Sequence, residues 1–178
     1  MWKWNRRDPF EVNAYYHIYN RWYNKTILFK DNHCFEKFYT YLVKYLDEYN
    51  WKLWIVSYSF LPNHFHLIIQ NFDGTGTQIS AFMKKLQWAY SVWFRTKFPL
   101  QDLDNGTQMK LPVFEGRFKA KLIDSDEYLY KCMAYVNFNP LKHEIVDNIN
   151  NYKWTSYHQI DKSKILNYKD LNLKELEF

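Results

Sequence analysis

The fold of this chain is decided by residues 53–69, which read Leu53-Trp-Ile-Val-Ser-Tyr-Ser-Phe-Leu-Pro-Asn-His-Phe-His-Leu-Ile-Ile69. Two apolar runs flank a short break at Leu61-Pro62-Asn63, which predicts an antiparallel hairpin with strands over 53–60 and 64–70. Side chains alternate between the two faces of a strand, so His64 and His66 should project side by side. Two imidazoles at this spacing can bind one divalent metal, but the short His-x-His pattern needs further support.

Periodic patterns outside the hairpin predict the remaining elements. These are a strand over 15–21, a helix over 31–49, a helix from Thr77 to Pro99, a strand over 117–123, and a helix from an Asp124 cap to Pro140. With right-handed crossovers, this order predicts an α+β, ferredoxin-like (split βαβ) antiparallel sheet. Two helices would cover one face, and the extra C-terminal helix would carry the candidate tyrosine described below.

Length and composition favour one globular domain over residues 1–178, with a core at about 12–160 and a tail at 161–178. An aromatic fraction of 21% excludes a disordered chain. No run is long and apolar enough to suggest a membrane helix, and residues 1–8 lack the apolar core of a signal peptide. Cys34 and Cys132 fall in helical patterns, so we expect buried thiols and a cytoplasmic protein.

Charge suggests a partner. The net charge is +5 and the pI is about 9.0, which with many aromatic residues suits a polyanion whose bases can stack. A merely basic soluble protein explains charge alone equally well. In the predicted 117–123 strand, Arg117, Lys119 and Lys121 alternate with apolar residues and should share one face. This face is a candidate to bind a polyanion, with Arg21 as a weaker candidate, and a merely solvated strand face is the alternative.

The third helix carries a second group of polar residues. Tyr135 and Asn139 are four residues apart, so they are neighbours on its surface. If the helix packs on the sheet face that carries His64 and His66, one site holds two imidazoles, an amide oxygen and a phenol. Such a mixed nitrogen and oxygen set suits Mg²⁺ or Mn²⁺ and phosphodiester chemistry, with a tyrosine oxygen as the nucleophile.

Three segments resemble one known family. Leu61-Pro-Asn-His-Phe-His-Leu-Ile-Ile69, Phe114-Glu-Gly-Arg-Phe-Lys-Ala-Lys-Leu-Ile-Asp-Ser-Asp-Glu-Tyr128 and Ala134-Tyr-Val-Asn-Phe-Asn-Pro140 are similar to the HUH-class single-tyrosine (IS200-like) transposases, and most similar to their REP-associated branch. The resemblance extends over about residues 12–160 and includes Tyr152-Lys-Trp-Thr-Ser-Tyr157. These motifs occur in the family's order, which makes them more specific than the histidine pair alone.

The resemblance implies roles for individual residues. His64 and His66 take the metal-binding positions, Tyr135 the nucleophile position, and Asn139 the third-ligand position, where the wider family often has Gln. The implied activity is cleavage and rejoining of single-stranded DNA near hairpins through a 5′-phosphotyrosine, by a monomer or a homodimer. The strand over 117–123 matches a region near the DNA path.

Three alternatives remain open. The first is a HUH nickase serving replication or plasmid transfer, which the small size and the lack of a helicase-like extension disfavour. The second is a domesticated, non-mobile relative that processes repeat hairpins. The third is a catalytically silent ferredoxin-like nucleic-acid-binding module, which the complete set of candidate site residues disfavours. The remaining histidines, His17, His33, His143 and His158, are assigned structural or surface roles, and neither the loop at 99–113 nor the tail after 160 receives a function.

Overall fold

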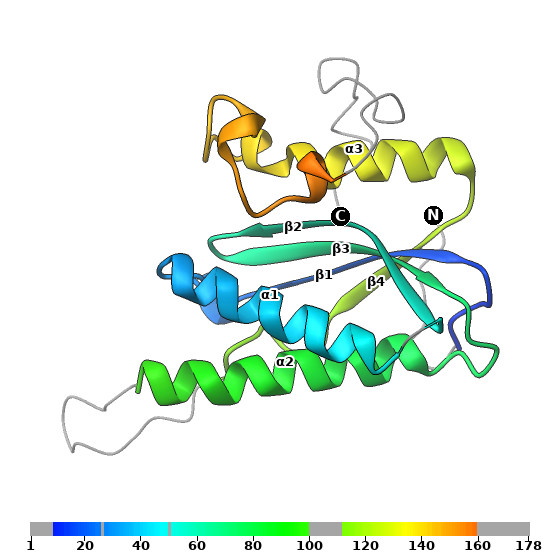
Figure 1. Cartoon of the computed structure of the whole chain (residues 1–178), viewed down its shortest axis with the longest axis horizontal. Coiled ribbons are helices and arrows are strands. Elements are labelled where there is room, and N and C mark those ends of the chain that lie inside the picture. The colour runs from blue at the N-terminus through cyan, green and yellow to red at the C-terminus, as the bar shows by residue number, and fades with distance from the viewer. Residues whose placement is uncertain (1–8, 26, 50, 100–111, 160–178) are drawn as a thin grey trace.

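A four-stranded antiparallel sheet lies at the centre of the molecule (Figure 1). The computed structural model describes residues 9–25, 27–49, 51–99 and 112–159. The strands are β1 (Tyr15–Arg21), β2 (Leu53–Leu61), β3 (His64–Asn71) and β4 (Lys119–Ile123). Their order is β2-β3-β1-β4, and all three neighbouring pairs are antiparallel. This is the split βαβ arrangement, so the predicted fold class is confirmed.

Two helices cover one face of this sheet. α1 (Asn32–Asp47) connects β1 to β2, and α2 (Gln78–Lys97) connects β3 to β4. Both lie below the sheet in Figure 1. Asp31 caps α1, because its side chain accepts a hydrogen bond of 2.8 Å from the backbone N–H of Cys34. None of the helices in the described ranges has the length and apolar character required to cross a membrane.

Aromatic rings fill the core between the sheet and these two helices. Phe38 of α1 makes edge contacts with Phe60 and Tyr90, with ring centroids 5.1 and 5.2 Å apart. All three rings are fully buried. Edge contacts of this kind add about 0.5–1.5 kcal/mol each beyond the burial of apolar area. The helices α1 and α2 therefore pack tightly on one face of the sheet, and the other face is left for further elements.

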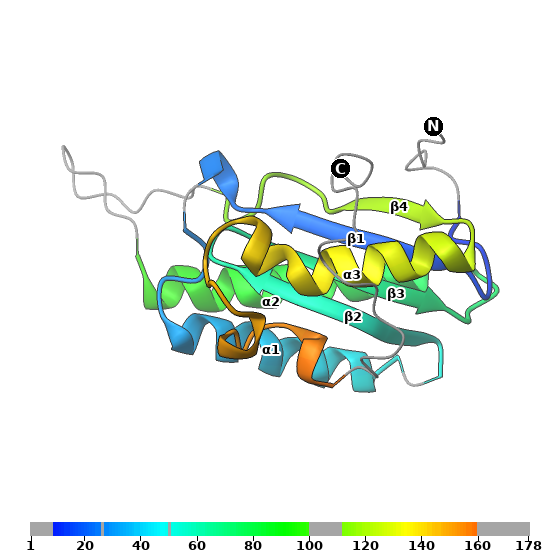
Figure 2. The same cartoon turned by 90° about the horizontal axis from the view of Figure 1, so that it is seen from above.

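α3 (Asp126–Lys142) packs on that other face, as Figures 1 and 2 both show. A smaller apolar cluster joins it to the sheet: Ile68, Ile123, Leu129, Cys132, Met133, Tyr135 and Val136. The register pairs Tyr19 with His66 and Arg21 with His64, so all four side chains belong to the face beneath α3. Both cysteines are buried and free, as predicted.

The predicted ends of α3 were wrong. Ser125, not Asp124, is the N-cap, because its hydroxyl accepts a hydrogen bond of 3.2 Å from the backbone N–H of Tyr128. The helix also passes through Pro140 and ends at Lys142. A proline this close to the C-terminus removes only one helical hydrogen bond, and the next amides still find partners, such as the His143 N–H to the Asn139 carbonyl at 3.1 Å.

The predicted start of the fourth strand was also wrong. β4 begins at Lys119, and its pairing with β1 starts at Tyr19. Just before it, Gly116 adopts a left-handed backbone with φ of 74°, a conformation that glycine adopts without a steric penalty. The Asn20 amide donates a hydrogen bond of 3.2 Å to the Gly116 carbonyl and holds this turn. Arg117 therefore lies outside the strand.

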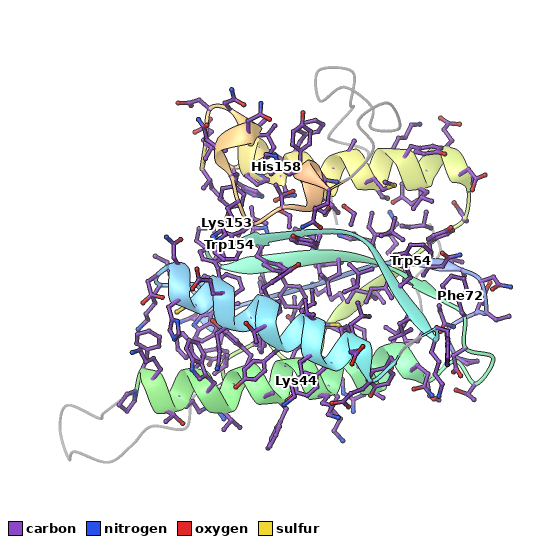
Figure 3. The ribbon with its side chains drawn as sticks, viewed as in Figure 1. Lys44, Trp54, Phe72, Lys153, Trp154 and His158 are labelled. Atoms are coloured by element: carbon purple, nitrogen blue, oxygen red, sulfur yellow. The ribbon has the colours of Figure 1, made fainter. Side chains whose placement is uncertain are left out.

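The segment after α3 ties this helix to the rest of the fold. The Ser156 hydroxyl accepts a hydrogen bond of 2.9 Å from the Tyr58 N–H on β2 and donates one of 2.8 Å to the Asn137 amide oxygen on α3. Trp154, labelled in Figure 3, stacks on Phe35 of α1 with centroids 5.1 Å apart. These contacts fix the position of α3 over the sheet.

Parts of the predicted organisation concern residues outside the described ranges. The polar loop predicted over 99–113 falls mostly on residues 100–111, and the tail covers 161–178. The domain limits predicted from the sequence stay a prediction.

Candidate active site

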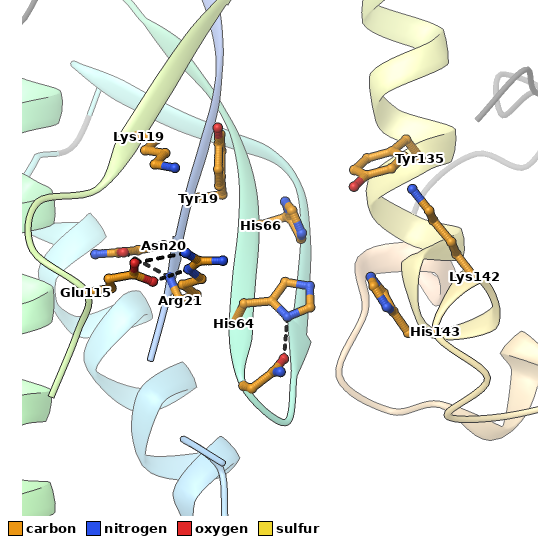
Figure 4. A pocket seen from close by; sticks show the side chains of 11 residues that line it. Tyr19, Asn20, Arg21, His64, His66, Glu115, Lys119, Tyr135, Lys142 and His143 are labelled. Carbon is orange, nitrogen blue, oxygen red and sulfur yellow. Dashed lines mark hydrogen bonds and ion pairs between the residues drawn. The ribbon is translucent and has the colours of Figure 1, made fainter. Parts of the chain in front are cut away.

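His64 and His66 lie next to one another on β3, beneath the C-terminal half of α3 (Figure 4). Their ring centroids are 5.0 Å apart, with the ring planes at 88°. The prediction that both rings share one face of the strand is confirmed. His66 is buried and His64 half-buried, so the first sits deeper below the helix.

Each ring is held by a hydrogen bond to its Nδ1 atom. The Nδ1 of His64 lies 2.5 Å from the amide oxygen of Asn63, which can only accept, so His64 carries its proton on Nδ1. The Nδ1 of His66 lies 2.8 Å from the Nε2 of His17. The Nε2 of His66 is buried and has no hydrogen-bond partner among the described residues. Both rings therefore use Nδ1 for orientation.

Burial keeps the two rings neutral at physiological pH. Desolvation lowers the pKa of His64 to about 4, helped by the neighbouring His143, although the Asn139 amide acts in the opposite direction. Desolvation also lowers the pKa of His66 well below its usual range. The neutral imidazole ring is the form that binds metals. Neither histidine would therefore have to release a proton before it binds a metal ion.

α3 brings Tyr135 and Asn139 to the same place. The Tyr135 ring makes an edge contact with the His66 ring, with centroids 5.6 Å apart. Asn139 follows one helical turn later and is fully buried. Its amide is close enough to raise the pKa of His64, yet neither amide atom has a hydrogen-bond partner among the described residues. An unpaired buried amide costs about 1–3 kcal/mol, which points to a ligand.

These orphaned atoms fit a metal ion. The described part of the chain holds no group of three or more His, Cys, Asp or Glu side chains suited to a metal. A metal here would instead take two imidazole nitrogens and the amide oxygen, and would keep open positions for phosphate oxygens. That donor set matches a mixed nitrogen and oxygen site for Mg²⁺ or Mn²⁺ better than a closed structural zinc site.

A pocket of about 470 Å³ opens in front of this group. Its lining consists of Tyr19, Asn20, Arg21, Asn63, His64, His66, Glu115, Lys119, Tyr135, Lys142 and His143. Three of these side chains are cationic and one is acidic. Glu115 forms a two-pronged ion pair with Arg21, which includes a hydrogen bond of 2.8 Å to the guanidinium. The surplus of positive charge suits a phosphate backbone.

The predicted DNA-contacting residues separate into two groups. Arg21 and Lys119 line the pocket. Lys121 is on the same face of β4, but its ammonium lies 5.0 Å from the centroid of the Tyr128 ring under α3. Arg117 is exposed and precedes the strand, and neither it nor Lys121 lines the pocket. Two of these four side chains therefore lie at the pocket, and DNA contact by any of the four stays a prediction.

Sequence reasoning missed three residues of this site. The sequence predicts a structural or surface role for His17; the structure buries this side chain and places its Nε2 2.8 Å from the Nδ1 of His66. His143 received the same assignment, yet it lines the pocket with Lys142. The sequence contains a signal for each histidine. His17 and Arg21 are an even number of residues apart on one strand, so they share a face. His143 follows Asn139 by one helical turn if the helix continues past Pro140.

Comparison with known proteins agrees with this arrangement. The sequence model of the family described as "Transposase IS200 like" matches residues 11–139. A Haemophilus influenzae protein described as a REP-associated tyrosine transposase is 24% identical over 142 residues, covering 71% of this chain and 76% of that protein.

Two solved structures share the fold. A REP-associated tyrosine transposase bound to a REP hairpin superposes with a TM-score of 0.69, covering 89% of this chain and 84% of the other, at 15% identity. A tRNA(His) guanylyltransferase from Saccharomyces cerevisiae reaches a TM-score of 0.50 over 76% of this chain and 62% of the other, at 10% identity. The family match begins before β1 and ends at Asn139, so it includes the histidine pair and Tyr135. The chain therefore belongs to the IS200-like transposase family, and its predicted kinship with the REP-associated tyrosine transposases is confirmed.

Proposed function

We propose that this transposase cleaves and rejoins single-stranded DNA near hairpins, with Tyr135 as the nucleophile and Mg²⁺ or Mn²⁺ as the cofactor. The observation that carries the proposal is the contact of Tyr135 with His66, 5.6 Å between ring centroids, at the edge of a cationic pocket. A phenol beside two neutral imidazoles has no obvious packing advantage over a phenylalanine. It has a clear use in phosphoryl transfer.

His64, His66 and Asn139 would hold the metal. His64 and His66 line the pocket, and Asn139 is fully buried beside them. The Nε2 of His66 and both amide atoms of Asn139 lack a hydrogen-bond partner among the described residues. When bound, such an ion polarises phosphate oxygens and stabilises the charge that develops on them.

The covalent step proposed for Tyr135 is a displacement at phosphorus. The Tyr135 oxygen forms a bond to the phosphorus atom, and the bond from phosphorus to the 3′ oxygen breaks. The phenol loses its proton, and the departing 3′ oxygen gains one, so no oxidant or reductant is needed. The products are a 5′-phosphotyrosine and a free 3′-OH. Attack by another 3′-OH reverses the step and joins a new pair of ends.

The cations of the pocket would bind and orient the DNA strand. Arg21, Lys119 and Lys142 line it and would supply positive charge to the phosphates of a bound strand. We infer hairpin DNA as the substrate class, supported by the related solved structure, which is bound to a REP hairpin.

The histidine pair and the tyrosine that faces it come from β3 and α3 of the same chain, which supports a site formed by one molecule. We therefore propose that a monomer is catalytically competent. A site formed by one chain differs from an arrangement in which two subunits exchange the helix that carries the tyrosine.

The test is incubation of the protein with a hairpin-bearing single strand and Mn²⁺, followed by a denaturing gel. The proposal expects a cleaved strand with a free 3′-OH and a protein–DNA adduct, both lost in EDTA. An unstructured strand of equal length is the control for hairpin recognition. Tight binding of the hairpin without cleavage or adduct would instead favour the silent nucleic-acid-binding module.

A further inference from the structure

His17 is a buried histidine on β1 that contacts a proposed metal ligand from behind. Its Nε2 lies 2.8 Å from the Nδ1 of His66, and the two ring planes are at 15° to one another. The His17 side chain is fully buried, and His66 is 5% exposed, so bulk water does not compete for this hydrogen bond. The bond joins β1 to β3 directly beneath Tyr135, whose ring centroid lies 6.1 Å from that of His17.

A hydrogen bond between two neutral imidazoles needs one N–H group and one lone pair. Two arrangements satisfy this condition. If His17 donates from Nε2, the proton of His66 sits on its own Nε2, which then cannot bind a metal. If His66 donates from Nδ1, its Nε2 keeps a lone pair directed away from His17. Only the second arrangement produces a metal ligand.

His64 has the same arrangement through a different partner. The Asn63 amide oxygen, 2.5 Å from the Nδ1 of His64, can only accept a hydrogen bond. The proton of His64 is therefore on Nδ1, and its Nε2 keeps a lone pair. The two rings are thus held alike, each through Nδ1, by a partner that fixes the ring orientation.

We propose that His17 is a positioning residue that accepts a hydrogen bond from the Nδ1 of His66 and thereby keeps the Nε2 of His66 available for the metal. The inference rests on the metal site of the proposed function. Partners of this kind set both the tautomer and the orientation of a metal-binding imidazole, and their loss typically lowers metal affinity by about 10–100-fold.

The experiment measures Mn²⁺ affinity by calorimetry for the wild type, His17→Leu and His17→Gln. Leucine fills most of the space but accepts no hydrogen bond, whereas the Gln amide oxygen can reach the place of the His17 Nε2. We expect a loss of about 10–100-fold in His17→Leu and recovery of most of it in His17→Gln. Thermal unfolding of each variant checks that the fold is kept, and His64→Ala identifies the heat that belongs to this site.

A second measurement needs no variant at position 17. Long-range ¹H–¹⁵N NMR of the metal-free wild type reports which nitrogen of each ring carries the proton before a metal binds. The proposal requires a proton on the Nδ1 of His66, and a proton on its Nε2 overturns it. Mn²⁺ binding that His64→Ala removes but His17→Leu leaves unchanged also overturns this inference and leaves the proposed function intact. No Mn²⁺ binding at all in the wild type would overturn both.

Discussion

Tyr135 and His66 meet edge to face between α3 and β3, with their ring centroids 5.6 Å apart and their planes at 87°. The two residues are far apart in the chain. They meet because α3 packs on the sheet face that α1 and α2 do not cover (Figures 1 and 2). The relationship places a phenol next to an imidazole whose outer nitrogen has no partner among the described residues. It also makes the site sensitive to any change that shifts α3.

Removal of either proposed histidine ligand should abolish cleavage. In His64→Ala or His66→Ala we expect no detectable product, while hairpin affinity falls by less than about threefold, because phosphate contacts from Lys and Arg dominate binding. Gel-based cleavage and fluorescence anisotropy measure the two quantities separately. Cleavage by the double variant in EDTA would contradict the proposed metal site.

Asn139 allows a test in which stability and function change in opposite directions. Asn139→Leu removes two buried amide atoms that lack partners among the described residues, so thermal stability should stay equal or increase by up to about 1–3 kcal/mol. Mn²⁺ affinity and cleavage should fall together. Thermal unfolding and calorimetry give the two readouts. A strong loss of stability would instead assign Asn139 a packing role.

Charge reversal separates the pocket cations from their neighbours on the same surface. Lys119→Glu should weaken single-strand binding and reduce the salt dependence by about one phosphate contact, because Lys119 lines the pocket. Arg117→Glu is the matched control, since Arg117 precedes β4 and does not line the pocket. Binding titrations at several salt concentrations compare them. Equal effects of both changes would argue for general attraction rather than a defined path.

Mixing two inactive variants tests whether one chain suffices. His64→Ala keeps its tyrosine, and Tyr135→Phe keeps its histidines. If the site assembles within a single chain, the mixture should form no adduct, and wild-type activity should be linear in protein concentration. Recovery of activity in the mixture would show that subunits exchange α3.

The sequence predicted the sheet and the sharing of one face by His64 and His66, because strand alternation depends only on local geometry. Prediction from the sequence failed at positions where contacts between distant parts of the chain determine the structure. α3 continues through Pro140, because a proline so close to the C-terminus costs only one helical hydrogen bond, and His143 after it lines the pocket. The Gly116 turn moved Arg117 off the strand. The role of His17 depends on a contact between β1 and β3, and spacing along one strand does not encode that contact.

The most direct test of the central claim is mapping of the covalent adduct. Tyr135→Phe removes only the attacking oxygen and keeps the ring, so folding and hairpin binding should survive while adduct and strand transfer disappear. Tyr128→Phe and Tyr130→Phe are matched controls on the same helix, and neither residue lines the pocket. Both should still form adduct. Mass spectrometry of a trapped wild-type adduct should find the nucleotide on the peptide that contains residues 132–142. A nucleotide on any other tyrosine, or adduct formation by Tyr135→Phe, would contradict the account.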